Sequence, residues 1–330
     1  MASSKIIDIL KPKDYDTNPE KYKKVSIVVV SDTHKNHEKL SIPDGDIFLH
    51  CGDFTNRHDW LNLSPDQIPQ SVIDFNQWLG KLSHQHKLVI CGNHELGFGK
   101  LFHEEIQSKY LTNCKYLKDE VIQIEDISIY GCPWPFTEHY RTKWPSIPSH
   151  IDILMTHVPP QFILDLAYQP KALSSTEPCS MCNNTVHGCY GHWGSASLIK
   201  EIRQRIQPRV HCFGHVHDDP GHKYDQDDTG TLFINAATDL TYQPKALSST
   251  EPCSMCNNTV HGCYGHWGSA SLIKEIRQRI QPRVHCFGHV HDDPGHKYDQ
   301  DDTGTLFINA ATDLSNRPFK FNFYVDLNKH

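Results

Sequence analysis

Acidic, amide and imidazole side chains stand in five short motifs, each directly after a run of apolar residues. In chain order the motifs are Asp32-x-His34, Gly-Asp at Asp53, Asn93-His94, His157, and a His-x-His pair at His215 and His217 that recurs at His289 and His291. Side chains two residues apart in extended chain point the same way, so Asp32 and His34 can converge on one ion. A single motif of this kind is common in turns, but the conjunction of all five predicts a metal site.

The donor types indicate which chemistry this site performs. Carboxylate, amide and imidazole donors without cysteine suit Mn, Fe, Zn or Ni better than Ca or an iron–sulfur cluster. There are too many donors for one ion, but they suit two ions that share one carboxylate. Two ions roughly 3.5–4 Å apart can polarise a phosphoryl oxygen and generate hydroxide at neutral pH. We therefore expect hydrolysis of a phosphate ester.

Strands must position these motifs. Short apolar segments that read as strands, each ending at one of the motifs, lie at residues 25–30, 46–51, 87–91, 151–156 and 209–213. Further predicted elements are helices over residues 70–82 and 195–206, a hairpin over residues 121–130, a strand over residues 231–235 that recurs over residues 305–309, and an edge strand over residues 319–327. Strands that alternate with helices predict an α/β fold, a layered β-sandwich flanked by helices, with its site at the carboxyl ends of the strands.

A 73-residue block is duplicated, because residues 168–240 recur without a single change as residues 242–314. The period is too long for the common solenoids, and two units are too few for one. Complete identity indicates either a recent tandem duplication or an error in the gene model. One sheet has room for a single His-x-His strand, so we expect one copy to lie outside the core. That copy would be loosely ordered, or exchanged between chains in a domain-swapped oligomer.

Chain-closure entropy and order of synthesis favour different copies as the source of the metal ligands. Use of the first copy lengthens the connection to the last strand at a cost of roughly 2.5 kcal/mol, and use of the second lengthens the loop after His157 at roughly 1 kcal/mol. Chain closure therefore favours His289 and His291. Order of synthesis favours His215 and His217, since that copy emerges first. Both pairs remain candidates.

Composition restricts the partners and the cellular location. The net charge of -7 gives no basic surface, so we expect no nucleic acid partner, while a small phosphate ester remains admissible near a metal. No apolar run approaches the roughly 18 residues of a membrane helix, and no signal peptide opens the chain. We expect a cytoplasmic protein with no membrane association, an N-terminal extension over residues 1–24 and one domain over residues 25–330.

A second cluster has the spacing of a small zinc knuckle. Its residues are Cys179, Cys182, His187 and His192. One interpretation is a structural zinc that ties a loop over the active site. The other is a polar lid whose histidines approach the substrate and whose thiols are unligated.

Taken together, the motifs Asp-x-His, Gly-Asp, Gly-Asn-His-Glu, His and Gly-His-x-His resemble those of the calcineurin-like metallophosphoesterases. Three further segments resemble the brain-type metallophosphoesterase-domain-containing subfamily: Gly-Asp-Phe-Thr at 52–55, Tyr-Gly-Cys-Pro-Trp at 130–134 and Ile-Asp-Ile-Leu-Met-Thr-His at 151–157. The resemblance runs from about residue 25 to the end of the chain. It implies the metallophosphoesterase fold and a phosphodiesterase that acts on a small phosphodiester or cyclic nucleotide.

The resemblance also implies a role for each motif residue. One metal takes Asp32, His34 and the second histidine of Gly-His-Val-His. The other takes Asn93, His157 and the first histidine of that motif. Asp53 would bridge both ions, and His94, which is not a ligand, would protonate the leaving group or stabilise the transition state. Some animal relatives carry glycine at the first of these histidines, whereas this chain keeps His215 and His289.

The resemblance implies two divalent ions, Mn, Fe or Zn, with Mn expected to support activity in vitro. The alternative function is a catalytically impaired metal-binding scaffold, made inactive by the duplicated block. A zinc-knuckle nucleic-acid module is disfavoured by the acidic charge.

Overall fold

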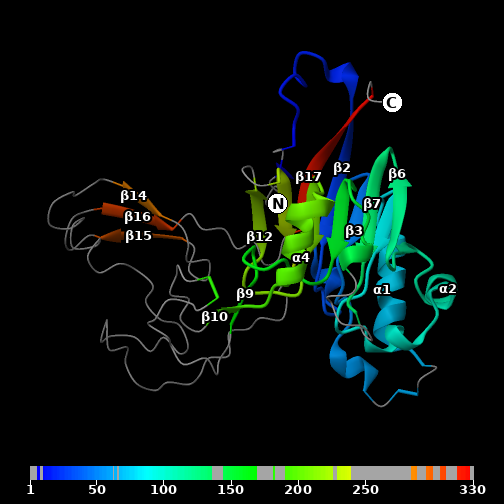
Figure 1. Ribbon diagram of the computed structural model, residues 1–330. Helices are drawn as coiled ribbons and strands as arrows, with labels where there is room; N and C mark the ends of the chain where they lie inside the picture. Colours follow the sequence, from blue (N-terminus) through cyan, green and yellow to red (C-terminus); the bar gives the residue numbers. More distant parts are fainter. Residues whose placement is uncertain are drawn as a thin grey trace. The chain divides into compact units, whose positions relative to one another are not determined.

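The structure is a computed structural model (Figure 1). It describes residues 6–7, 10–61, 63–64, 67–135, 144–168, 181–182, 190–225, 229–238, 284–287, 295–299, 305–309 and 318–327. The chain divides into two compact units, Met1–Leu240 with Ser315–His330 and Thr241–Leu314. Within the described ranges, no helix has both the length and the apolar character needed to cross a bilayer.

Strands dominate the first unit. They are β1 (Ile6–Ile7), β2 (Tyr22–Val30), β3 (Ile47–His50), β4 (His86–Val89), β5 (Lys115–Tyr116), β6 (Glu120–Ile124), β7 (Ile127–Cys132), β8 (Ile153–Thr156), β9 (Leu166–Tyr168), β10 (Tyr190–His192), β11 (Val210–Phe213), β12 (Gly221–Asp225), β13 (Thr231–Asn235) and β17 (Phe319–Asp326). The α-helices are α1 (Gln70–Lys81), α2 (His103–Glu105) and α4 (Ala196–Glu201). Short 3-10 helices are η1 (Pro19–Lys21), η2 (His37–Lys39), η3 (Arg57–Trp60), η4 (Leu96–Lys100) and η6 (Trp144–Ser146), and π turns are η5 (Ile106–Tyr110) and η7 (Ile202–Ile206).

The first sheet has the order β1-β17-β2-β3-β4-β5. Strands β2 to β5 are parallel, and β17 runs antiparallel to β2 from the pair Phe319–Val29 to the pair Asp326–Tyr22. The prediction that the last strand lies at an edge is wrong, because β1 pairs with its other side. The sheet also includes residues from the predicted 1–24 extension, since β1 and the start of β2 belong to it.

The second sheet has the order β12-β13-β11-β8-β7-β6. Its inner strands β7, β8, β11 and β13 are parallel, and the edge strands β6 and β12 pair antiparallel to their neighbours. The predicted hairpin is the β6–β7 pair. The first copy of the duplicated block supplies β11, β12 and β13, which are half of this sheet.

The two sheets form the middle layers of a sandwich, and helices cover its outer faces (Figure 1). On β2, Val28 and Val30 pack with Phe75 of α1 in one hydrophobic cluster. The alternate residues Ile27 and Val29 are fully buried as well. Because side chains alternate between the faces of a strand, both faces of the first sheet must be covered, one by α1 and the other by the second sheet. This confirms the predicted α/β fold.

Both predicted helices form where the apolar periodicity places them. The helix α1 covers nearly all of the predicted range, and its buried apolar residues lie along one face, with Trp78 and Leu79 three and four positions after Phe75, which itself lies three after Val72. On the outer face of the second sheet, Ile202 and Ile206 of η7 pack with Phe213 of β11 and Phe233 of β13. The helix predicted over residues 195–206 is therefore present as α4 followed by one π turn.

The second unit contains a small sheet of its own. Its described strands are β14 (Val284–Phe287), β15 (Gly295–Asp299) and β16 (Thr305–Asn309), in the order β14-β16-β15. Strand β14 is parallel to β16, and β15 is antiparallel to it. The same pairing joins β11, β13 and β12 in the first copy, so identical sequences form identical local strand pairs.

Candidate metal centre

The predicted motifs lie at one edge of the sandwich, where parallel strands of both sheets end. Strands β2, β3 and β4 run parallel in the first sheet, and β8 and β11 run parallel in the second. Backbone hydrogen bonds join the segments that leave these strands. The Ser31 N–H donates to Ala236 O and the Asp32 N–H donates to Gly52 O, both at 2.9 Å. The two sheets therefore deliver their carboxyl-end loops to one place, where α/β sheets bind ligands.

Four of the predicted donors have a left-handed backbone conformation. The angle φ is 58° at Asp32, 42° at His34, 55° at Asp53 and 72° at His215. Each costs a residue other than glycine on the order of 1–2 kcal/mol, so four together are typical of a functional site. Hydrogen bonds hold these turns: the His34 N–H donates to Asp53 O at 3.0 Å, and the His215 N–H donates to Asp32 Oδ2 at 3.0 Å.

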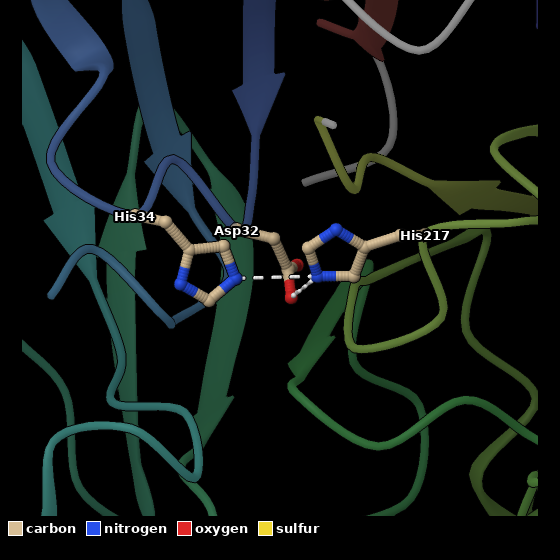
Figure 2. Close-up of side chains that lie close together, drawn as sticks. All are labelled: Asp32, His34 and His217. Atoms are coloured by element: carbon tan, nitrogen blue, oxygen red, sulfur yellow. Dashed lines mark hydrogen bonds and ion pairs between the residues drawn. The ribbon is translucent and has the colours of Figure 1, made fainter. Parts of the chain in front are cut away.

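Asp32, His34 and His217 form the first cluster of donors (Figure 2). The Nε2 atom of His217 lies 3.2 Å from Asp32 Oδ1 and 3.2 Å from His34 Nε2. The two imidazole rings are inclined by only 22°, with their centroids 5.0 Å apart. Because Asp32 follows β2 and His217 follows β11, this cluster joins the two sheets.

Asp53, His157 and His215 form the second cluster, and Asn93 lies between its imidazoles. Asn93 Oδ1 is 2.9 Å from His157 Nε2 and 2.9 Å from His215 Nδ1. Asp53 Oδ2 is 3.4 Å from His157 Nε2. A carboxylate oxygen, an amide oxygen and imidazole nitrogens thus lie close enough together to bind one small cation.

Asp53 also contacts the residues beside the first cluster, because it forms a further group with His34 and His94. His94 Nε2 lies 3.7 Å from Asp53 Oδ2, and the His94 side chain is 28% exposed. The Arg57 N–H donates to His94 Nδ1 at 3.1 Å. Since Nδ1 accepts that bond, the neutral ring carries its proton on Nε2, the nitrogen that faces Asp53.

The hydrogen bonds of two histidines show that this arrangement fits cations. His34 Nδ1 donates to Thr55 O at 3.1 Å, and His157 Nδ1 donates to Cys51 O at 2.8 Å. A carbonyl oxygen only accepts, so the Nε2 lone pair of each ring faces the cluster, as in metal-binding histidines. The lone pair of His157 points at Asn93 Oδ1, a second acceptor. The two atoms repel each other unless a proton or a metal ion lies between them.

Buried charges control protonation in these clusters. Burial raises the pKa of Asp32, but the charge of His157 and a hydrogen bond from His217 outweigh it and hold this pKa below its usual range. Burial lowers the pKa of His157, but Asp53 and Asp32 outweigh burial and raise it to about 9. The two carboxylates are 1% and 2% exposed. Such a buried negative pair requires a positive partner, and a divalent cation meets that need as well as a proton does.

Glu95 is a site residue to which the sequence reasoning assigned no role. It is fully buried and accepts four hydrogen bonds. Its Oε2 accepts from the Gly92 N–H at 2.7 Å and the Asp53 N–H at 2.9 Å, and its Oε1 accepts from the N–H and the hydroxyl of Thr55, both at 2.9 Å. Burial and the Asp53 charge raise the pKa of Glu95 to about 8, opposed by these donors. The sequence signal for this role was the position of Glu95 as the last residue of the Gly-Asn-His-Glu motif.

The structure brings together all the predicted metal-binding residues that it describes. They are Asp32, His34, Asp53, Asn93, His157, His215 and His217. The alternative pair, His289 and His291, lies outside the described residues. Within the described part of the chain, the first copy of the duplicated block therefore provides the His-x-His pair of the site.

The predicted zinc knuckle falls largely outside the described residues, as Cys179 and His187 do. Cys182 and His192 are described, and His192 Nδ1 lies 2.8 Å from Asp165 Oδ1. A structural zinc at this cluster stays a prediction.

Comparison with known proteins agrees with this geometry. The model of the calcineurin-like phosphoesterase family matches residues 25–219, which is more than half of the chain and includes both metal clusters. The chain therefore belongs to the calcineurin-like phosphoesterase family. It is a metal-dependent hydrolase of phosphoric ester bonds, and the histidine and aspartate clusters indicate binding of divalent metal.

Relatives place the chain more closely. The UPF0046 protein C25E10.12 of Caenorhabditis elegans is 36% identical over 72% of this chain and 83% of that protein. Metallophosphoesterase domain-containing protein 1 of Homo sapiens is 34% identical over 66% of this chain and 67% of that protein. The predicted resemblance to this subfamily is confirmed. The solved structure of TT1561 from Thermus thermophilus reaches a TM-score of 0.40 at 12% identity, over 64% of this chain and 89% of that one.

Proposed function

We propose that the protein is a dinuclear metallophosphoesterase that hydrolyses small phosphodiesters, cyclic nucleotides among them. One observation carries this proposal: donors from the loops of both sheets meet in two clusters with Asp53 between them. A phosphodiester carries a single negative charge and two ester oxygens, so it suits a site that is itself lined by buried carboxylates. The subfamily resemblance supports the preference for a diester over a phosphoprotein.

Seven side chains would hold two divalent cations, for which we propose Mn, Fe or Zn. Asp32, His34 and His217 would take one cation, Asn93, His157 and His215 the other, and the Asp53 carboxylate would be shared. When bound, the two cations would polarise the phosphoryl oxygen and supply the nucleophile. The protein itself contributes the fixed positions of these donors, because the left-handed turns and the carboxylate of Glu95 hold the loops before substrate arrives.

We assign the proton transfer to His94. Its Nδ1 accepts a hydrogen bond from the Arg57 N–H, so its Nε2 holds a proton that faces the centre beside Asp53. Burial lowers the pKa of His94, which favours the neutral ring with its single proton on Nε2. The side chain is 28% exposed, so the leaving oxygen of a bound ester can reach it. His94 would therefore protonate the leaving group.

Hydrolysis of bis-p-nitrophenyl phosphate with added Mn tests this function. We compare the full chain with a version that lacks Thr241–Leu314, and use Asp53→Asn in both as the inactive control. We expect both versions to hydrolyse the ester, because the described site is built from the first unit alone. A cyclic nucleotide should be hydrolysed faster than a phosphoserine peptide.

Two other outcomes have different meanings. Activity in the shortened version alone would favour the catalytically impaired scaffold for the full chain. Absence of hydrolysis in both versions, with Mn bound to each, would contradict the proposed function.

A further inference from the structure

Trp193 is a large aromatic side chain that is 48% exposed beside the metal centre. It directly follows β10, and its ring centroid lies 5.7 Å from that of His215, with 40° between the ring planes. Single exposed apolar residues are ordinary on protein surfaces. Trp193 differs from them in its neighbour, since His215 belongs to the second donor cluster. A ligand bound at that cluster therefore lies next to the exposed indole.

The backbone around Trp193 is fixed to the segment that follows β8. Three consecutive N–H groups donate hydrogen bonds to that segment: Trp193 to Asp165 O at 3.0 Å, Gly194 to Asp165 Oδ2 at 3.0 Å and Ser195 to Pro159 O at 2.8 Å. The segment leaves β8 at His157, another donor of the second cluster. The backbone that carries the indole is thus connected to the metal centre through a few hydrogen-bonded residues.

Asp165 is the residue that holds this arrangement together. It is only 1% exposed, and its carboxylate also accepts from the Phe162 N–H at 3.0 Å and lies 2.8 Å from His192 Nδ1. Gly194 leaves no space between the two segments, because a Cβ atom there would lie 2.5 Å from Pro160 O. A buried carboxylate with this many partners costs much to disrupt. The backbone that carries the exposed indole is therefore held in place, and a ligand that stacks on the indole need not order this backbone first.

Trp193 and the proposed proton donor lie beside different clusters. The His94 ring centroid is 4.6 Å from that of His34, whereas the Trp193 ring is next to His215. A phosphodiester has two substituents, of which one leaves. If the leaving substituent lies at His94, the retained substituent can extend along the second cluster towards Trp193.

We infer that Trp193 is a specificity-determining residue that stacks on an aromatic ring in the retained substituent of the ester. This inference rests on the proposed function and adds a substrate class to it, phosphate esters that carry an aromatic or heteroaromatic group. A ring stacked on the indole gains a favourable interaction beyond the burial of its area, and an alkyl group does not.

Binding of phosphonates tests the stacking without turnover. Phenylphosphonate and methylphosphonate are titrated into the Mn-loaded protein, because neither has an ester bond to hydrolyse. For Trp193→Ala we expect an affinity for phenylphosphonate that is about 3- to 10-fold lower and an unchanged affinity for methylphosphonate. Trp193→Phe keeps a ring and should retain most of the preference. Manganese content should be the same in all variants, since Trp193 is not a ligand.

The second copy of the block offers a matched control. Trp267 stands in the same sequence as Trp193, so Trp267→Ala removes the same side chain from the same local context. We expect it to change neither affinity. The inference would be overturned if Trp193→Ala lowered the affinity for both phosphonates equally. It would also be overturned if Trp267→Ala lowered the affinity for phenylphosphonate as much as Trp193→Ala does.

Kinetics then separate this inference from the proposed function. Bis-p-nitrophenyl phosphate and methyl p-nitrophenyl phosphate have the same leaving group and differ in the retained one. In Trp193→Ala, kcat/KM should fall about 3- to 10-fold for the first ester and remain unchanged for the second. If the unmodified protein hydrolyses both esters and Trp193→Ala lowers kcat/KM equally for both, the proposed function holds and the stacking does not. Loss of phenylphosphonate preference in a protein that hydrolyses neither ester would support the stacking and reject the function.

Discussion

His94 and Glu95 are adjacent in sequence but have opposite environments. The His94 side chain is 28% exposed next to Asp53, while Glu95 is fully buried and accepts hydrogen bonds from three backbone N–H groups. The first can reach a substrate, and the second can act only through the residues it holds. Exposure therefore distinguishes a residue that acts on the reaction from one that positions the metal ligands.

Replacing each residue with glutamine should separate these two roles. His94→Gln removes the proton donor, so we expect kcat to fall about 10²- to 10⁴-fold with manganese content unchanged. Glu95→Gln places an amide NH₂ opposite backbone N–H donors that bond to the carboxyl oxygens of Glu95 in the unmodified chain. Its manganese affinity should therefore fall about 10- to 100-fold. Metal titration followed by steady-state kinetics at saturating manganese measures both effects.

A surface carboxylate is the matched control for the second change. Glu38 is exposed and pairs with Lys81 on the surface, so Glu38→Gln should leave metal affinity and kcat unchanged. If Glu95→Gln bound manganese as tightly as the unmodified chain, its assigned positioning role would be wrong.

At the scale of elements, the metal centre depends on the loops that follow the strands more than on the strands themselves. The loop after β11 crosses to the first sheet, where the His215 N–H bonds to the carboxylate of Asp32. Gly214 makes this crossing possible, because a Cβ atom there would overlap with Ser31 Oγ and Asp32 Oδ2. The absence of a side chain at one position thus allows the two sheets to share a metal site.

Gly214→Ala should therefore disturb the centre more than the sandwich. We expect manganese affinity to fall, and the free energy of unfolding to decrease by about 1–3 kcal/mol, since the added methyl group must displace its neighbours. Metal titration and denaturant unfolding measure the two changes. Gly288→Ala is the matched control, because Gly288 has the same neighbours in sequence and should change neither quantity. A Gly214→Ala variant with normal metal affinity would show that the close approach is unimportant.

At the scale of the whole molecule, two identical copies of one block have different surroundings. The first copy contributes three strands to the second sheet, and its His215 and His217 contact Asn93 and Asp32. The described strands of the second copy pair with one another in a separate sheet. The two copies have the same side chains, so only chain connection and order of synthesis distinguish them. The expectation that a single copy enters the core stays a prediction.

Alanine substitution of each histidine pair tests that expectation. We expect His215→Ala with His217→Ala to lower kcat/KM about 100-fold or more, because a donor is lost from each cluster. His289→Ala with His291→Ala should leave kcat/KM unchanged. Equal losses from both double variants would mean that both copies reach the metal centre, within one chain or in a domain-swapped oligomer. Gel filtration of the two variants distinguishes these cases.

The sequence by itself determined the features that depend on neighbouring residues. The apolar spacing of α1, the β6–β7 hairpin and the strands that end at a donor all follow from local periodicity, and the structure contains them. The order of the motifs also identified the family. The donor types and their positions after apolar segments can be read from the sequence without knowing which strands pair. The seven donors that meet at the centre follow from their side-chain types and their places after strands, since a metal site requires those side-chain types.

Only the tertiary structure decided the features that depend on distant residues. Strand β17 lies inside its sheet because a two-residue strand near the N-terminus covers it, which no local pattern indicates. Several contacts join segments far apart in the chain. They are the hydrogen bonds of Glu95, those between Asp165 and the backbone at Trp193 and Gly194, and the contact of His215 with Asn93. Local periodicity reports which face of an element is buried. Which segments meet depends on the packing of the whole chain, and in two identical copies the local sequence is the same by definition.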